Sequence, residues 1–291
     1  TTTYPTFDVI SGSAPLRAVA LLAAVFVVVV LTMVVFEKSL IFFPTSYPDG
    51  EWDVEVVAGE PGVILEDCFY SSEDGVKLHS WWCRTEEPDP EGPVLLLFHG
   101  NAGNLSHRAD LMLELASRVG AEVVVAGYRG YGRSEGKPSE KGLYADARAA
   151  WRFVTVDRGV DPDRVVVFGK SLGGAVAINL ATEIDPGGLI VESSFTSIPD
   201  MAARHYPFVP KFLIRTRMDS LAKISGIRCP LLVIHSRADE VAPFEYGGKL
   251  FDAAPQPKKF HEVQGAGPTE TWLVGGRTYF DAIRSFVHSD H

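Results

Sequence analysis

The chain has 291 residues, of which 46% are hydrophobic and 22% charged, an ordinary globular composition that allows one or two domains, including a single α/β domain of roughly 250 residues. The formal net charge of −10 argues against a nucleic-acid-binding protein, because no basic stripe is present to displace counterions from phosphates. The three cysteines, Cys68, Cys83 and Cys229, cannot form a complete disulfide framework and leave the redox compartment open.

An uncharged apolar stretch near the N-terminus predicts a membrane anchor. Residues 1–14 are small and polar and are expected to be mobile. The stretch Ala18–Phe36 reads AVALLAAVFVVVVLTMVVF, and its about nineteen residues nearly match the ~30 Å hydrocarbon thickness. The run is long for a buried core helix, and the following FEKSL lacks the cleavage pattern of a signal peptide. We expect an uncleaved single-pass anchor over residues 15–37. Arg17 stands before the span and Lys38 after it, so the lysine and arginine bias that would predict its orientation in the membrane is nearly balanced.

An antiparallel pair of strands opens the remainder, residues 38–291. VILEDCFY and VKLHSWWCR are β-like segments separated by the turn residues SSEDG. A turn centred on Glu73 and Asp74 places Cys68 opposite about Lys77 to His79 and not opposite Cys83. A bond between these two cysteines is therefore not expected.

Strands and helices then alternate along the chain. The apolar segments PVLLLFHG, AEVVVAGYRG, DRVVVFG, GGLIVESSF, CPLLVIHS and KKFHEVQG have the length of buried strands. Between them lie SHRADLMLELASRVG, SEKGLYADARAAWRFVTVDRG and SLGGAVAINLATEI, which have helical spacing. This order predicts an α/β fold with a mostly parallel sheet covered by helices on both faces. Ligands of such sheets gather at the carboxyl ends of the strands.

The motif VVVFGKSLGGAVA carries the strongest chemical signal. Gly169, Ser171 and Gly173 form G-x-S-x-G between a strand and a helix, the setting of a nucleophile elbow. The turn has no room for side chains at the glycines, and the amide of Leu172 points toward any oxyanion that forms. The dipeptide before the serine also resembles a phosphate loop, but that motif needs a glycine at Arg164.

Two further segments complete the predicted constellation. Residues 98–104, FHGNAGN, follow the strand that lies two strands before the elbow strand in the chain. The backbone amide of Asn101 is therefore the expected second oxyanion donor. The alternative is a simple glycine turn. HSRADEVAPFE places Asp239 after the strand Leu231 to His235, where a triad acid belongs. Asp239 also suits a helix cap, and Glu240 and Glu192 are alternative acids.

These segments together resemble the α/β-hydrolase fold, and specifically the membrane-anchored Bem46-like and ABHD13-like serine hydrolases. The resemblance runs from about Leu40 to Phe286 and rests on IFFPTSYP, FHGNAGNLSHR, GYRGYGRSEGKPSEKGLYADA, GKSLGGAVA, ESSFTSIPDMAARHYPFVP and HSRADEVAPFEYGGKLF. It implies hydrolysis of ester or thioester bonds at Ser171, with Asp239 as the acid. It also implies a small cap over about residues 195–228.

The family histidine is missing from this sequence. The last family element reads approximately G-A-G-H-N-D-T, whereas this chain has GAGPTET, so Pro268, Thr269 and Glu270 stand at the places of the histidine, asparagine and aspartate. Without a general base, Ser171 is a poorly activated alcohol. Loss of a triad histidine typically costs on the order of 10⁴ to 10⁶ in turnover and leaves about 10³ to 10⁴ over water.

No other histidine replaces it convincingly from its sequence position. His261 lies within the last strand, some 20 Å of chain before the loop at ~3.3 Å per residue. His99 is expected to pack beneath the oxyanion loop, and His288 and His291 belong to the terminal helix and tail. His235 is the best substitute, although a histidine at a strand end is usually structural.

The cap segment offers apolar and basic side chains with two interpretations each. The apolar set either lines an acyl pocket or packs against the body; its members are Met201, Tyr206, Phe208, Val209 and Phe212. The basic set either meets anionic headgroups or forms a solvated helix face; its members are Lys211, Arg215, Arg217 and Lys223.

The sequence therefore predicts a membrane-anchored serine esterase or acyl hydrolase, impaired at its base. The alternative is a catalytically silent domain that binds a lipid or protein partner at the membrane, and Pro268 favours it. A small or lipid-like acyl ester and membrane lipid are the expected partners. No cofactor or metal is expected, because no cluster has ligand spacing.

Overall fold

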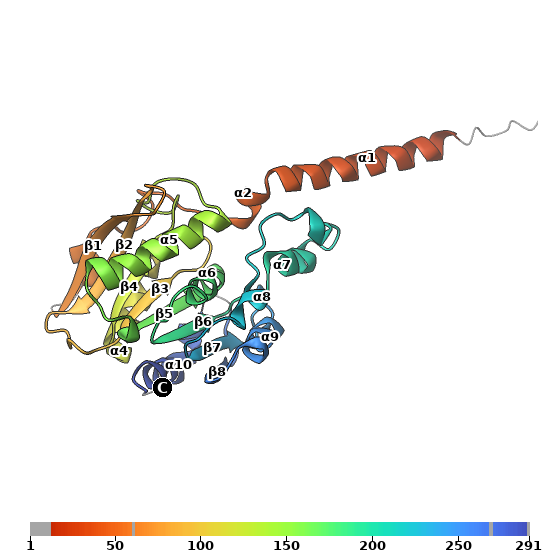
Figure 1. The fold of residues 1–291 in the computed structure, drawn as a ribbon. Helices are drawn as coiled ribbons and strands as arrows, with labels where there is room; N and C mark the ends of the chain where they lie inside the picture. Colours follow the sequence, from red (N-terminus) through yellow and green to blue (C-terminus); the bar gives the residue numbers. More distant parts are fainter. Residues whose placement is uncertain (1–12, 60–61, 268–269, 290–291) are drawn as a thin grey trace, which may run out of the picture.

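An eight-stranded sheet forms the centre of the computed structural model, which describes residues 13–59, 62–267 and 270–289 (Figure 1). The strand order is β1-β2-β4-β3-β5-β6-β7-β8. The strands are β1 (Val63–Ser71), β2 (Lys77–Thr85), β3 (Val94–Phe98), β4 (Glu122–Ala126), β5 (Val165–Lys170), β6 (Gly188–Glu192), β7 (Leu231–Ser236) and β8 (Lys258–Val263). Only β2 runs antiparallel to its described neighbours, and every other pair is parallel. The predicted mostly parallel sheet is confirmed.

The β1–β2 hairpin has a register one residue away from the predicted one. Cys68 lies opposite Ser80, because the connection keeps five residues, Ser72 to Val76, between the paired strands. Cys83 lies opposite Leu65, and all three cysteines are free and buried. The expectation that Cys68 and Cys83 do not bond is confirmed.

Helices cover the sheet on both faces, as the alternation predicted. One face carries α5 (Glu140–Arg152), α6 (Leu172–Ala181), α8 (Ser220–Ile224) and α9 (Phe244–Ala253), and the other carries α4 (Ala109–Val119) and α10 (Thr271–Val287). Shorter turns are α3 (Val54–Ala58), η1 (Leu105–Arg108), the π-helical turn η2 (Phe153–Asp157) and η3 (Pro162–Arg164).

Two apolar cores result from the alternation of side chains along the central strands. In β3, Leu96 and Phe98 pack into the core beneath α5 and α6, whereas Leu95 and Leu97 pack into the core beneath α4 and α10. The period of two along a strand sends successive side chains to opposite faces. Both faces of β3 are buried, which explains its continuous apolar sequence.

The terminal helix α10 begins at Thr271. Gly276 interrupts it with φ 49° and ψ −130°, a backbone conformation that L side chains rarely adopt. Pro268, Thr269 and His291 lie outside the described residues, as do residues 1–12 of the segment expected to be mobile.

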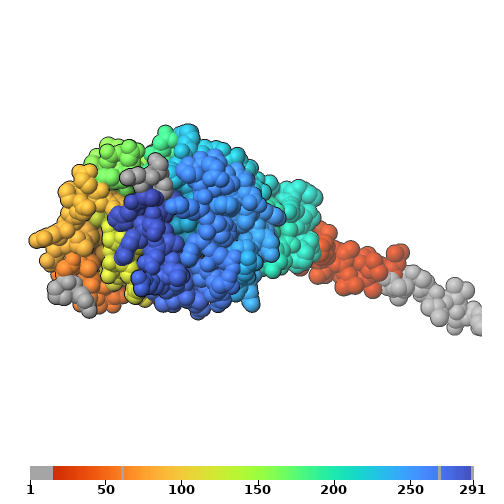
Figure 2. Space-filling model, turned by 90° about the horizontal axis from the view of Figure 1, so that it is seen from below, coloured from red at the N-terminus to blue at the C-terminus, as the bar shows by residue number. Residues whose placement is uncertain are grey.

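The N-terminal helix α1 (Ser13–Val35) extends away from the sheet (Figure 1) and is followed by the short α2 (Glu37–Ile41). Its segment Leu16–Val35 has a mean hydropathy of 3.1 and is 6% buried, which makes it long and apolar enough to cross a membrane. The segment between β6 and β7 holds α7 (Ile198–His205), η4 (Lys211–Leu213) and α8. Figure 2 shows α1 leaving the molecule beside this segment.

Candidate active site

Ser171 stands on a strained turn between β5 and α6. Its φ is 52° and its ψ −114°, a combination that costs a non-glycine residue about 1–3 kcal/mol. The serine amide donates to the carbonyl of Glu192 at 2.8 Å, which ties the turn to the end of β6. This geometry lifts the serine above the carboxyl ends of the parallel strands.

The two motif glycines are required by close backbone approach. A Cβ on Gly169 would lie 2.3 Å from the carbonyl oxygen of Gly173, and a Cβ on Gly173 would lie 1.9 Å from that of Phe98. Both distances are far below contact. A side chain at Gly169 would force β5 and α6 apart, and one at Gly173 would force α6 away from the end of β3. The sequence G-x-S-x-G is thus a packing requirement at this turn.

Residues 98–104, which include the predicted oxyanion donor Asn101 and are called the oxyanion segment below, lie directly against Ser171. A Cβ on Gly100 would lie 3.5 Å from the Cβ of Ser171, so the neighbouring Asn101 amide is close to the nucleophile. Leu172 begins α6, where a first-turn amide has no partner within its helix. Ser171, Asn101 and Leu172 all line one cavity.

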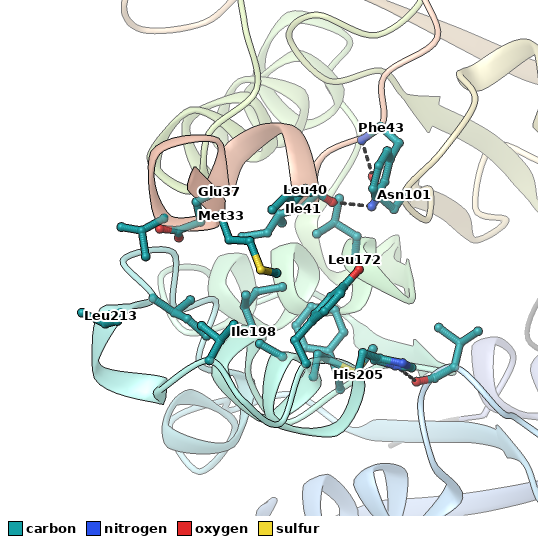
Figure 3. A pocket seen from close by; sticks show the side chains of 18 of the residues that line it. Met33, Glu37, Leu40, Ile41, Phe43, Asn101, Leu172, Ile198, His205 and Leu213 are labelled. Atoms are coloured by element: carbon teal, nitrogen blue, oxygen red, sulfur yellow. Dashed lines mark hydrogen bonds between the residues drawn. The ribbon is translucent and has the colours of Figure 1, made fainter. Parts of the chain in front are cut away.

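The Asn101 side chain has a structural task that the sequence did not suggest (Figure 3). Its Nδ2 donates to the Ile41 carbonyl, and its Oδ1 accepts from the Phe43 amide and the Tyr131 hydroxyl, both at 3.0 Å. The side chain therefore fastens the oxyanion segment to the chain that leaves α2. The backbone amide stays available for an oxyanion.

Asp239 is buried with one oxygen held by the backbone. Its Oδ1 accepts from the amides of Val241 and Ala242 at 2.9 and 2.8 Å. Its Oδ2 is buried and has no hydrogen-bond partner among the described residues. Ser236, at the end of β7, donates to the Ala266 carbonyl at 2.6 Å and so fixes the chain two residues before Pro268.

His235 does not take the place of the missing base. Its Nε2 lies 2.8 Å from the Ala242 carbonyl, which can only accept, so this nitrogen carries the proton. Its Nδ1 faces α9, since a Cβ on Gly247 would lie 2.4 Å from that atom. Burial lowers the pKa of His235, which keeps the ring neutral. His235 is a structural residue that supports the Asp239 turn.

The other histidines weighed from the sequence are also structural. His99 is buried beneath the oxyanion segment, with Nδ1 donating to the Gly100 carbonyl at 2.7 Å, and burial lowers its pKa to about 3. His261 lies in β8, where burial lowers its pKa. His288 contacts the Val119 carbonyl at 3.0 Å.

His205 is the histidine that sequence reasoning missed. It ends α7, lines the cavity with Ser171, and its Nε2 lies 3.1 Å from the Val241 carbonyl (Figure 3). The Val241 amide in turn donates to Asp239. No sequence signal marked His205, because its approach to the site depends on how the cap folds over the sheet.

Glu192, which the sequence offered as an alternative acid, takes part in a separate buried network. It is fully buried, its Oε1 lies 2.8 Å from Lys170 Nζ, and the Tyr279 hydroxyl donates to its Oε2 at 2.7 Å. Burial raises the pKa of Glu192, but the Lys170 ammonium and hydrogen bonds from Lys170, Thr271 and Tyr279 outweigh it, so the pKa is below its ordinary value. This network joins the serine turn to the start of α10.

An apolar cavity of about 480 Å³ lies above Ser171 (Figure 3). Its walls come from α1 and α2 on one side and from the cap on the other. They include Met33, Val34, Leu40, Ile41, Phe43, Ile198, Met201, Ala202, Tyr206, Val209, Leu213 and Ile214. The cap therefore supplies Met201, Tyr206 and Val209 as the sequence suggested.

Two aromatic residues and one lysine of the cap lie elsewhere than expected. Phe208 and Phe212 are not among the cavity-lining residues, and Phe212 is 83% exposed. Lys223 contacts the Tyr144 hydroxyl and Asn179 Oδ1 at 3.1 and 2.7 Å, and burial lowers its pKa. Lys223 thus faces the body of the protein, because α8 packs on α6.

The remaining basic residues of the cap each pair with a carboxylate. Lys211 Nζ lies 2.6 Å from Asp200, Arg215 Nε 3.7 Å from Glu37, and Arg217 Nη2 3.8 Å from Asp219. In the part of the chain that the structure describes, no group of three or more His, Cys, Asp or Glu is placed to hold a metal.

Comparison with known proteins finds relatives that agree on the α/β-hydrolase fold. A family model for the alpha/beta hydrolase fold matches residues 93–187. The chain is 36% identical over 273 residues to the Uncharacterized protein Rv2307c of Mycobacterium tuberculosis, covering 94% of each chain. It is 33% identical over 284 residues to the Alpha/beta hydrolase domain-containing protein WAV2 of Arabidopsis thaliana, covering 89% of each.

More distant matches agree with these. The chain is 32% identical over 235 residues to human Alpha/beta hydrolase domain-containing protein 17B, covering 77% of this chain and 80% of that protein. Among solved structures, the Pyrococcus furiosus esterase Pf2001 superposes with a TM-score of 0.68 at 20% identity, over 84% of this chain and 98% of the esterase. At that identity the esterase shows a shared fold.

The buried Lys170–Glu192 pair generates a stability prediction. We expect Lys170→Met to lower the free energy of unfolding at pH 7 by about 3–5 kcal/mol, because it leaves a buried carboxylate uncompensated. The folded pKa of Glu192 is below its unfolded value, so the pair stabilises the fold above the unfolded pKa near 4.3 and loses this effect as pH falls through the folded pKa. Urea unfolding in detergent at pH 7 and near pH 4 measures both effects.

The matched control is Lys141→Met, at an exposed lysine of α5. It is expected to change the free energy of unfolding by no more than about 0.5 kcal/mol at either pH. Equal effects of the two substitutions, or a Lys170→Met effect that grows toward pH 4, contradict the role assigned to the pair.

Proposed function

Since this chain belongs to the α/β-hydrolase superfamily, we propose that it is a membrane-anchored serine hydrolase of ester or thioester bonds, with Ser171 as nucleophile. The observation that carries the proposal is the strained backbone of Ser171 at the floor of an apolar cavity. Strain of this kind is found where a fixed geometry serves chemistry. The apolar walls suit the acyl chain of a substrate.

The proposed reaction is acyl transfer to Ser171 followed by hydrolysis. The serine oxygen attacks the acyl carbonyl, and its proton passes to the leaving alcohol or thiol through a base. The amides of Asn101 and Leu172 stabilise the oxyanion of the tetrahedral intermediate. Water then attacks the acyl-enzyme and releases the acid. Asp239 Oδ2 is buried, lies 3.7 Å from His235 Nε2 and has no hydrogen-bond partner among the described residues, so it could accept the N–H of a triad histidine.

The residue that stands at the position of the family histidine limits this chemistry. Pro268 offers no side-chain acceptor, so the parent chain is expected to hydrolyse esters weakly. The same substitution supports the second candidate function, a catalytically silent domain that binds a lipid or protein partner. Both functions use the same cavity, and they differ in whether Ser171 reacts.

Restoring the histidine tests the hydrolase proposal. We expect Pro268→His to raise hydrolysis of a short-chain p-nitrophenyl ester by perhaps ~10²-fold, short of the full triad effect because proline also fixes φ near −65° and shapes the loop. The gain should disappear with Ser171→Ala. It should also fall as pH drops through the imidazole pKa, near 6.5 when unperturbed. Fluorophosphonate labelling of Ser171 in the parent and the variant provides a parallel measure of nucleophilicity.

Ordinary enzyme rates in the parent would contradict the missing-base account. In that case the histidine to replace is His205, which lines the cavity, and not His235, whose two ring nitrogens face Ala242 and Gly247. His205→Gln then abolishes the parent rate if the cap supplies the base. Absence of fluorophosphonate labelling in both the parent and Pro268→His favours the silent binding domain.

The anchor has a separate prediction. We expect carbonate-washed membranes to retain the full-length chain, because Leu16–Val35 is apolar and almost fully exposed. A chain without the anchor should retain Glu37, because Glu37 accepts from the amides of Arg215 and Thr216 at 3.1 and 2.6 Å. A chain starting at Phe36 keeps these bonds and should be recovered in the soluble fraction. Release of the full-length chain by carbonate refutes anchoring.

A further inference from the structure

The tip of the cap exposes aromatic side chains, and two of them, Phe208 and Phe212, do not line the cavity above Ser171. Within Tyr206–Leu213, Tyr206 is 42% exposed, Phe208 45% and Phe212 83%. We call this segment the cap tip. Large aromatic side chains gathered on one exposed segment mark a surface that contacts another apolar phase.

The cap tip touches the middle of the apolar helix. The rings of Phe208 and Phe26 lie 6.2 Å apart, edge to face. Phe26 precedes Val35 by nine positions, which corresponds to ~14 Å along the helix axis. If α1 crosses a bilayer whose surface lies near Val35, then Phe208 lies below the headgroups, even with an ordinary tilt.

Charged groups mark the level of the membrane surface. Arg215 donates to the Val34 carbonyl at 2.9 Å and pairs with Glu37, at the end of the apolar span. Lys211, beside Phe212, pairs with Asp200, and its side chain is more than half exposed. Phe208 packs against Phe26 on the α1 side of this level, and aromatic residues are enriched at membrane interfaces.

The cavity above Ser171 shares its walls with these elements. Met33 and Val34 of α1, Leu40 of α2, and Tyr206 and Leu213 of the cap tip all line it. An acyl chain lying between α1 and the cap tip therefore reaches Ser171 through an apolar path.

We infer that the cap tip lies within the bilayer beside α1, so that the cavity opens into the hydrocarbon region and receives the acyl chain of a membrane lipid sideways. This inference rests on the proposed function for its anchor and its serine. The proposed occupant of the exposed aromatic surface is the lipid bilayer that α1 is long and apolar enough to cross.

The depth of the cap tip is measurable in the full-length chain. Cys68, Cys83 and Cys229 are buried, so a maleimide carrying the NBD fluorophore is directed to an introduced cysteine. Phe212→Cys reports on the cap tip, and Val156→Cys, 69% exposed beyond the far end of α5, is the matched control. Both are reconstituted in vesicles of equal parts phosphatidylcholine and phosphatidylglycerol, and protein-bearing vesicles are isolated by flotation.

Quenchers on the two sides of the interface then locate each label. Phosphatidylcholine brominated on its acyl chains should quench the label at residue 212 by at least ~2-fold, as expected for a group in the acyl region. Aqueous iodide should quench the label at residue 156 and leave that at 212 nearly unchanged. A chain that floats with the vesicles but shows iodide quenching at residue 212 overturns the inference and leaves the anchor intact. A chain that does not float overturns both.

Lipid entry is tested without relying on catalysis. A phosphatidylcholine with a diazirine in its acyl chain is added to the same vesicles and activated by light. Crosslinks to the peptide containing Leu172, at the cavity floor, are expected in both the parent and Ser171→Ala. Val209→Trp, which fills the cavity from the cap side, should reduce these crosslinks several-fold while those to α1 persist. Absence of crosslinks at the floor, with crosslinks on α1 present, refutes lipid entry. Catalytic failure alone changes none of these signals.

Discussion

The close approach of β5 and α6 is the constraint on which the candidate site depends. Two glycines let the strand turn into the helix with backbone atoms in contact, and the turn between them forces Ser171 into a positive φ. The segment at residues 98–104 can lie against the serine because Gly173 also lets α6 approach Phe98 at the end of β3. A methyl group at either glycine would move Ser171 away from the amides of Asn101 and Leu172 that we propose as oxyanion donors. Packing at one turn therefore determines the geometry of the whole site.

The rest of the site is held by polar contacts that reach the same turn from different parts of the chain. The Lys170–Glu192 pair ties it to Tyr279 of α10, and Asn101 ties the oxyanion segment to the chain leaving α2. Buried charged networks of this kind are costly unless every member is satisfied. Their effect is to fix the start of α10 relative to Ser171.

Sequence patterns predicted the features that depend on neighbouring residues in the chain. Continuous apolar runs predicted the parallel strands, and the G-x-S-x-G spacing predicted the tight turn that carries Ser171. The hairpin register was missed by one residue, since loop length and not the turn centre sets it. His205 and the wall formed by Met33 could not be found, because they reach the cavity through the folding of the cap and the exit of α1. Phe212 was assigned inward, although helix η4 leaves it exposed.

The geometry also bears on the choice between an impaired hydrolase and a silent binding domain. Binding an acyl chain needs the cavity and its apolar walls. It needs neither a strained serine nor a buried acid whose second oxygen has no hydrogen-bond partner in the described chain. Each of these features costs folding free energy. A site selected only for binding gains nothing from them. Their presence beside the changed positions Pro268, Thr269 and Glu270 therefore supports the proposed reaction centre that lacks its base, and the two proposed functions differ at Pro268.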